Sequence, residues 1–169
     1  LYAWSKYGGE ALVLMMGGVA LRYFNVYGEH ESHKGKMASI MYQAWVKNKN
    51  NIEVKLFPHE PKRDFVYIDD VISANIHAWE QYDFLGGNSY DVGVGEHNTF
   101  ERVMELMGIP YTIDENVTIP KYYQWVTKAN KKNFMSGWQP KYKLEDGVAK
   151  YLYFLNNYQS KYDDNKLLH

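Results

Sequence analysis

Short apolar runs alternate with helical patterns along this chain, and this alternation restricts the possible folds more than any other feature of the sequence. Runs rich in β-branched and aromatic residues are typical of strands, and they occupy 19–28, 52–57, 64–70 and 89–95. The segments around them place apolar residues on one stripe of a helix, and they occupy 3–16, 37–47, 71–82, 100–108 and 147–158. Strands that alternate with helices predict an α/β fold with a partly parallel sheet.

The sequence lacks the turn with which a dinucleotide-binding sheet begins. Such a sheet opens with a strand, a G-x-G-x-x-G turn and a helix. The pairs at 8–9 and 17–18 have the wrong spacing, and Gly93-x-Gly95 lacks the third glycine. The chain also begins without Met, inside a predicted helix. We therefore expect a fragment whose phosphate-binding half lies elsewhere.

The overall charge argues against nucleic acid as a partner. The chain has 19 basic and 20 acidic residues and a formal net charge of −1, so it lacks the basic field that nucleic-acid binding requires. No stretch approaches the roughly 20 apolar residues of a membrane span, and we expect no membrane partner. The absence of cysteine excludes disulfides and thiol chemistry and is compatible with the cytoplasmic location that we expect.

Aromatic residues are unusually frequent, with 16 Tyr and 5 Trp. Tyr and Trp combine an apolar ring with one polar group, which suits sugars and nucleotides, although most such residues pack the core and surface of a protein. Three histidines, His30, His33 and His59, have neither cysteine partners nor the helical spacing of a metal site. We therefore expect no metal centre.

Tyr2 and Lys6 form a Tyr-x-x-x-Lys pair in the first predicted helix. Positions i and i+4 lie on the same face of a helix. A lysine ammonium close to a tyrosine hydroxyl favours the phenolate form, which can take a proton from a sugar hydroxyl and return it. The pair is a candidate acid/base centre, although this short pattern also arises often by chance.

The segment LRYFNVYG at 21–28 ends a predicted strand with Asn-x-x-Gly. Ligands of parallel sheets bind at the carboxyl ends of the strands. Asn25 can both donate and accept hydrogen bonds, so it can bind a sugar hydroxyl or a phosphate. The alternative is that Asn25 only caps the strand and stabilises the turn.

Together these motifs resemble the extended short-chain dehydrogenase/reductase family, which contains sugar-nucleotide epimerases and dehydratases. Similar segments follow in the same order, namely RDFVYIDD at 63–70, YDVGVG at 90–95 and a helix start at Thr99-Phe100. The resemblance covers roughly residues 1–155. It implies an α/β fold that comprises the C-terminal part of a Rossmann-like doubly wound sheet and a smaller α/β substrate-binding domain.

The resemblance also implies a division of the chain. Residues 1–28 would end the dinucleotide-binding domain, residues 29–155 would be mainly the substrate-binding domain with returning Rossmann elements, and residues 156–169 would form a tail. Two spacings depart from the family pattern, because the link between Lys6 and Asn25 and the segment after Phe57 are both short. We expect the loop that faces the base or phosphate to differ accordingly.

Within this family, HKGKMAS at 33–39 resembles the corresponding loop of the ADP-L-glycero-D-manno-heptose 6-epimerases, as do Lys55-Leu-Phe57 and Tyr123-Gln124. This resemblance implies an isomerase that inverts C6 of ADP-glycero-manno-heptose, as in lipopolysaccharide core biosynthesis. The reaction would proceed by transient oxidation and reduction with bound NADP (or NAD). The implied partners are an ADP-sugar substrate and further copies of the chain in a homo-oligomer.

The same resemblance assigns roles to individual residues. Tyr2 and Lys34 would act as acid/base groups on the two faces of the sugar carbon, and Lys6 would complete the catalytic set. The alternative for Lys34 is an exposed loop lysine that binds a phosphate. The cofactor-binding positions would be Lys6, Val26 and Lys34. The substrate-binding positions would be Asn25, Lys36, Gln43, Arg63 and Tyr123.

Two other functions stay open on the sequence alone. The chain could belong to another sugar-nucleotide epimerase, reductase or dehydratase of the same family. It could also be a truncated module that binds a nucleotide sugar without catalysis.

Overall fold

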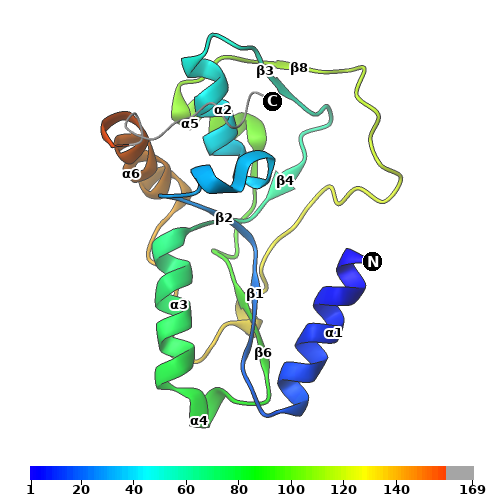
Figure 1. Ribbon diagram of the computed structural model, residues 1–169, viewed down its shortest axis with the longest axis vertical. Coiled ribbons are helices and arrows are strands. Elements are labelled where there is room, and N and C mark those ends of the chain that lie inside the picture. The colour runs from blue at the N-terminus through cyan, green and yellow to red at the C-terminus, as the bar shows by residue number, and fades with distance from the viewer. Residues whose placement is uncertain (159–169) are drawn as a thin grey trace.

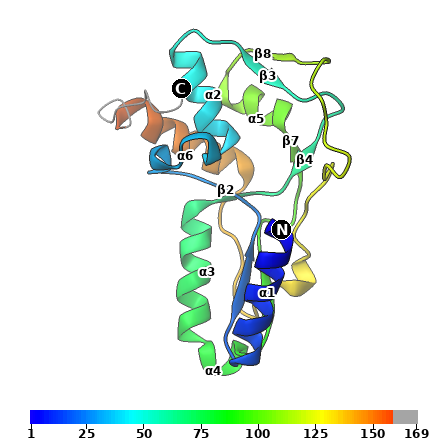
Figure 2. The same ribbon diagram turned by 45° about the vertical axis from the view of Figure 1, so that its right-hand side comes forward.

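The computed structural model describes residues 1–158 and arranges them as two groups of elements (Figure 1). In the lower group, Figure 1 shows two paired strands with one long helix on each side, and in Figure 2 the N-terminal helix lies in front of these strands. The lower group contains α1 (Tyr2–Met15), β1 (Ala20–Tyr23), α3 (Ile68–Glu80), α4 (Tyr82–Leu85) and β6 (Ser89–Val92).

The upper group combines short strands with helices around a core of its own (Figure 1). Two further strands, β2 (Asn25–Tyr27) and β5 (Phe65–Tyr67), connect the groups, and η2 (Lys131–Asn133) packs beside β6. The upper group contains η1 (Ser32–Met37), α2 (Ile40–Lys49), β3 (Val54–Leu56), β4 (Lys62–Arg63), β7 (Asn98–Thr99), α5 (Phe100–Met107), β8 (Tyr111–Ile113) and α6 (Leu144–Asn157).

The strand pairs within residues 1–158 are mainly parallel. β1 pairs with β6, β2 with β5, and β3 with β8 in parallel register, whereas β4 and β7 are antiparallel. Parallel strands joined by helices confirm the expected α/β class with a partly parallel sheet.

The single strand predicted at 19–28 is wrong in one respect, because it consists of two strands with different partners. The amide of Phe24 donates to Val92 O at 3.1 Å and extends the pairing of β1 with β6, whereas the amide of Asn25 donates to Asp64 O at 2.9 Å and begins the pairing of β2 with β5. The chain therefore passes from the lower group to the upper group at Phe24.

One helix end differs from the sequence-based expectation, because the carboxylate that could cap the helix instead binds a distant loop. Asp69 and Asp70 directly precede the helix predicted at 71–82, where either carboxylate is suited to cap it, but α3 begins at Ile68 without a side-chain cap. Asp70 is instead buried, and its carboxylate accepts the amides of Lys141 and Tyr142 at 2.8 and 3.0 Å. The carboxylate therefore anchors a distant loop, which sequence spacing could not reveal.

Two apolar clusters stabilise the molecule. One contains Trp45, Met104 and Leu155 and lies within the upper group. The other contains Val66, Val92 and Trp138 and packs α3 against β5 and β6. α6 runs to Asn157, and residues 159–169 of the predicted tail lie outside the described part of the chain. The division of the chain at residue 28 stays a prediction.

Candidate active site

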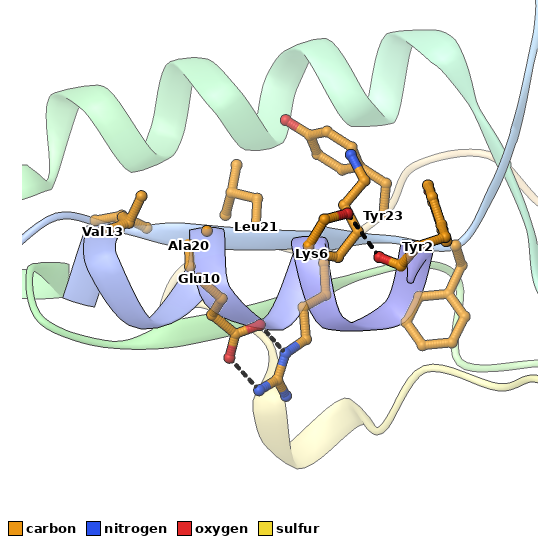
Figure 3. Close-up of a pocket in the computed structure, with 12 residues that line it drawn as sticks. Tyr2, Lys6, Glu10, Val13, Ala20, Leu21 and Tyr23 are labelled. Carbon is orange, nitrogen blue, oxygen red and sulfur yellow. Dashed lines mark hydrogen bonds and ion pairs between the residues drawn. The ribbon is translucent and has the colours of Figure 1, made fainter.

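A cavity of about 800 Å³ lies between α1 and β1. Figure 3 shows Tyr2, Lys6 and Glu10 along α1, with Ala20, Leu21 and Tyr23 of β1 beside them. The lining residues are Tyr2, Ser5, Lys6, Gly9, Glu10, Val13 and residues 19–24.

The Tyr2–Lys6 pair lies on one face of α1, as helical spacing predicts. The Nζ atom of Lys6 is 5.5 Å from the centre of the Tyr2 ring. The Oγ of Ser5 donates to the carbonyl oxygen of Tyr2 at 2.8 Å. Tyr2 is 76% exposed, so its hydroxyl is accessible to a ligand.

A salt bridge that the sequence analysis missed connects the two walls of the cavity. The guanidinium of Arg22 on β1 donates to both carboxylate oxygens of Glu10 on α1, at 2.9 and 2.5 Å. Hydrogen bonding from Arg22 is the main cause that lowers the pKa of Glu10, and the same bond raises the pKa of Arg22. Asp91 on β6 adds a weaker contact to Arg22 at 3.9 Å. These charges hold α1 against the strands.

Asn25 and Val26 lie on β2, directly after the lining residue Phe24. They pair with Phe65 and Val66 of β5. Asn25 is exposed and Val26 is partly buried. Both residues are therefore at the carboxyl end of the β1 segment, where a parallel sheet binds its ligands.

Lys34 and Lys36 lie in η1, the short helix before α2. The Nζ atom of Lys34 is 3.9 Å from the carboxylate of Glu31. Gln43 of α2 donates its side-chain amide to the carbonyl oxygens of Lys36 and Ala38, at 3.3 and 2.7 Å. Gln43 and the backbone of Lys36 are thus joined, whereas the Lys36 side chain is exposed.

Arg63 and Tyr123 are also brought together. The guanidinium carbon of Arg63 lies 5.1 Å from the centre of the Tyr123 ring and 5.7 Å from that of Phe100. Tyr123 makes edge-to-face contacts with Phe57 and Trp125, at centre distances of 5.6 and 5.1 Å. Helical or strand spacing does not predict these aromatic contacts, because Phe57 and Phe100 are far from Tyr123 along the chain and Trp125 lies beside it in a loop.

Three pairs of predicted site residues are therefore in contact: Tyr2 with Lys6, Gln43 with Lys36, and Arg63 with Tyr123. The cavity lining includes Tyr2 and Lys6 but neither Asn25 nor Lys34. Convergence of Tyr2, Asn25 and Lys34 on one sugar carbon stays a prediction.

Residues 1–158 contain neither a metal cluster nor a membrane-spanning helix. No group of three or more His, Asp or Glu side chains in this part of the chain could hold a metal ion. None of its helices combines the length and apolar character needed to cross a membrane.

Comparison with known proteins gives a family and several related structures. Residues 1–93 match the NAD dependent epimerase/dehydratase family. The chain is similar to ADP-L-glycero-D-manno-heptose-6-epimerase of Helicobacter pylori, with 31% identity, a TM-score of 0.78, and coverage of 92% of this chain and 50% of that one.

Two more distant structures share the fold. UDP-glucose 4-epimerase of Thermotoga maritima, solved with UDP-glucose, has 24% identity and a TM-score of 0.76, with 92% of this chain and 53% of that chain covered. RMD of Pseudomonas aeruginosa, solved with NADPH, has 20% identity and a TM-score of 0.71, with 95% and 56% covered. The chain thus spans about half the length of the structures that it matches.

Proposed function

The chain belongs to the NAD dependent epimerase/dehydratase family, and we propose that it supplies the acid/base and sugar-binding part of a sugar-nucleotide epimerase. The proposed reaction is inversion at C6 of ADP-glycero-manno-heptose through transient oxidation and reduction with NADP. Similarity to a heptose epimerase over 92% of the chain supports this substrate, as does the HKGKMAS segment at 33–39.

One observation carries the proposal: Tyr2 and Lys6 share the face of α1 that lines the cavity beside β1. A phenol with an ammonium nearby is suited to proton exchange with a sugar hydroxyl. The exposed position of Tyr2 leaves its hydroxyl accessible to a substrate that enters this cavity.

The residues of the cavity fit one end of a nicotinamide cofactor. The ammonium of Lys6 is a donor for ribose hydroxyls, and Val26 and Lys34 would provide further contacts. No G-x-G-x-x-G turn is present in the sequence, so the cofactor's phosphates would be bound by another part of the fold. A bound nicotinamide cofactor would supply the hydride chemistry, that is, reversible oxidation of the sugar carbon.

Inversion requires the sugar carbon to be approached from both faces. Tyr2 would take the hydroxyl proton at its Oη atom as the sugar is oxidised. Lys34 would donate one proton from Nζ to the carbonyl oxygen as the sugar is reduced on the opposite face, and proton exchange with solvent would then restore both side chains. Neither side chain then has to move between the two half-reactions.

Five residues would bind the ADP-sugar. Arg63 would bind the diphosphate, because a planar guanidinium matches phosphate oxygens with two donors at once. Asn25, Gln43 and Tyr123 would hydrogen-bond the sugar nucleotide, and Lys36 would be a further substrate contact.

The rest of the dinucleotide-binding domain would pack on α1 and β1. Within residues 1–158, β1 pairs with β6 alone, and α1 has no buried residue. Large apolar side chains of α1, including Trp4 and Met15, are exposed. An exposed apolar face beside an unpaired strand edge is typical of an interface.

The test is an assay of ADP-, GDP- and UDP-sugars side by side, with the protein translated from its complete reading frame. We expect interconversion of the C6 epimers of ADP-glycero-manno-heptose and no turnover of the GDP- or UDP-sugars. Turnover of a GDP- or UDP-sugar in place of the heptose would assign another reaction of the same family.

The second candidate is a module that binds a nucleotide sugar without catalysis. It is favoured by one observation, namely that Arg63 and Tyr123, both proposed to bind the ADP-sugar, lie in contact with each other outside the cavity that Tyr2 and Lys6 line. This candidate gains if the 169-residue chain binds an ADP-sugar and the complete protein binds no nicotinamide cofactor.

A further inference from the structure

Glu31 is a buried carboxylate with several donors around it. Only 3% of its surface is exposed. One carboxylate oxygen accepts the hydroxyls of Ser39 and Tyr151, at 2.6 and 2.7 Å, and the other accepts the amide of Ser39 at 2.7 Å. A buried carboxylate is stable only when it is paired in this way, so Glu31 is held in one position.

The donors to Glu31 belong to two different helices. Ser39 is the N-cap of α2, where its Oγ also accepts the amide of Tyr42 at 3.3 Å. Tyr151 lies in α6, 120 residues further along the chain than Glu31. Burial, followed by the negative charge of Glu31, raises the pKa of Tyr151, so its hydroxyl stays protonated and donates. Glu31 is thereby fixed to the core of the upper group.

Lys34 forms a long ion pair with this fixed carboxylate. Its Nζ atom lies 3.9 Å from the Oε2 atom of Glu31, while 39% of the Lys34 side chain remains exposed. The following residue, Gly35, has a φ of 54° that turns the backbone sharply. Lys34 therefore combines an anchored ammonium with access to solvent, whereas no ion pair is present at Lys36, two residues later, in the described structure.

We propose that Glu31 is a positioning residue that orients the ammonium of Lys34 toward the sugar. This proposal rests on the proposed function, which gives Lys34 its acid/base role. A lysine has four rotatable side-chain bonds and a mobile charge, so a fixed anion restricts the positions that the ammonium adopts. A displacement of about 1 Å in a catalytic group can reduce a rate by about 100-fold.

A different role for Glu31 would be purely structural, as the anchor that joins η1 to α2 and α6. Thermal unfolding alone cannot separate the two roles. The position and mobility of the Lys34 ammonium separate the two roles. If Glu31 were only an anchor, replacing it would leave the Lys34 ammonium unchanged as long as Ser39 and Tyr151 remain hydrogen-bonded to residue 31.

The test compares Glu31→Gln, Glu31→Asp and the control Glu29→Gln. Gln preserves the size of the side chain but removes the charge. Asp preserves the charge on a shorter side chain, so Glu31→Asp still tests the position of the Lys34 ammonium if Glu31→Gln folds poorly. Glu29 is a matched control, because it lies two residues away and its carboxylate accepts from Tyr67 at 2.5 Å rather than contacting Lys34.

The first readout does not depend on activity. Lysines are reductively methylated with ¹³C-formaldehyde, and the Lys34 signal is assigned by its loss in Lys34→Arg. We expect Glu31→Gln to move this signal to the position of the exposed Lys36, Glu31→Asp to move it less, and Glu29→Gln to leave it unchanged. A Lys34 signal unaffected in Glu31→Gln would overturn the proposal.

The second readout is the rate of epimerisation by the complete protein. We expect kcat to fall about 10-fold to 100-fold in Glu31→Gln, with KM within about twofold, partial rescue in Glu31→Asp and normal rates in Glu29→Gln. An unchanged kcat despite a moved Lys34 signal would overturn the positioning role. If Glu31→Gln moves the Lys34 signal but the wild-type protein shows no epimerisation, the Glu31–Lys34 contact is supported and the proposed function is overturned.

Discussion

At the scale of single residues, the sequence identifies contacts that depend on helical spacing. Tyr2 and Lys6 are four positions apart, and the structure places them in contact on one face of α1. The partners of Glu31 could not be predicted in the same way, because Ser39 and Tyr151 reach it only through tertiary packing. Contacts between distant segments carry no periodic signal in a single sequence.

The role of Tyr2 gives the first residue-scale prediction. Tyr2→Phe removes the hydroxyl and keeps the ring, so kcat for epimerisation should fall about 100-fold to 10,000-fold with little change in KM. The control is Tyr7→Phe, because Tyr7 is 67% exposed on the same helix and is not part of the cavity lining. Steady-state kinetics of both variants decide the matter, and near-normal turnover in Tyr2→Phe would remove Tyr2 from the mechanism.

Lys34 gives the second residue-scale prediction. Lys34→Met keeps much of the side-chain volume but removes the amine, so epimerisation should nearly cease while ADP-sugar binding persists. Isothermal titration and a rate assay measure the two properties separately. Lys55→Met serves as the control, because Lys55 is an exposed lysine on β3 that pairs with Glu53. Weakened binding with an unchanged kcat would instead assign Lys34 to phosphate binding.

At the scale of helices and strands, the local sequence pattern predicted whether a segment is helix or strand better than it predicted where the segment begins and ends. The helix predicted at 100–108 is confirmed as α5, which Thr99 and Gly108 flank as caps, with Thr99 accepting the amide of Arg102 at 3.0 Å and Gly108 at a φ of 64°. The strand at 19–28 was predicted as one element, since apolar composition does not indicate a change of partner strand. The role of Asp70 as a helix cap is wrong, because a carboxylate can accept backbone amides either at a helix start or from a distant loop, as Asp70 does at Lys141 and Tyr142.

The cap of α5 gives a prediction about stability. Thr99→Ala leaves the amide of Arg102 without its partner, so the free energy of unfolding should decrease by about 1 kcal/mol. Urea unfolding of the purified chain measures this change. Thr118→Ala, at an exposed loop position, should change stability by less than about 0.5 kcal/mol. Equal effects of both substitutions would mean that the cap contributes nothing.

The Glu10–Arg22 bridge between α1 and β1 gives a prediction about pH. Hydrogen bonding to Arg22 lowers the pKa of Glu10 below its ordinary value of 4.5. The bridge therefore stabilises the fold above pH 4.5, and this contribution is lost as the pH falls through the lower folded-state pKa. Because Arg22 is half exposed, the contribution should be at most about 1 kcal/mol.

The measurement compares urea unfolding of the wild type and Glu10→Gln at about pH 7 and about pH 3. The wild type should be more stable at the higher pH, and the difference should shrink on acidification. A difference that stays constant with pH would contradict the assigned role of the bridge.

At the scale of the whole molecule, acid/base and sugar-binding candidates lie in one chain whose sequence contains no G-x-G-x-x-G turn for the phosphates of a dinucleotide. The cavity between α1 and β1 borders the exposed apolar face of α1. The missing glycine pattern predicts that the phosphate-binding half lies elsewhere, and the chain spans about half the length of the structures that it matches. The sequence could not predict the arrangement of the two groups of elements, which depends on packing between Val66, Val92 and Trp138.

The missing glycine pattern gives a prediction about cofactor binding. The 169-residue chain alone should bind NADP at least about 100-fold more weakly than the complete protein, because most phosphate contacts are absent. Both forms should retain ADP-sugar binding through Arg63 and Tyr123. Fluorescence titration with NADPH measures the first affinity, and equal NADPH affinities would mean that the chain carries a cofactor site of its own.

The most direct test of the central claim is epimerisation of unlabelled ADP-glycero-manno-heptose by the complete protein in D₂O, followed by NMR of the product. Transient oxidation, with Tyr2 handling only the hydroxyl proton, predicts that the product carries no deuterium at C6 and that Tyr2→Phe yields almost no product. Stoichiometric deuterium at C6, or full activity of Tyr2→Phe, would contradict the account.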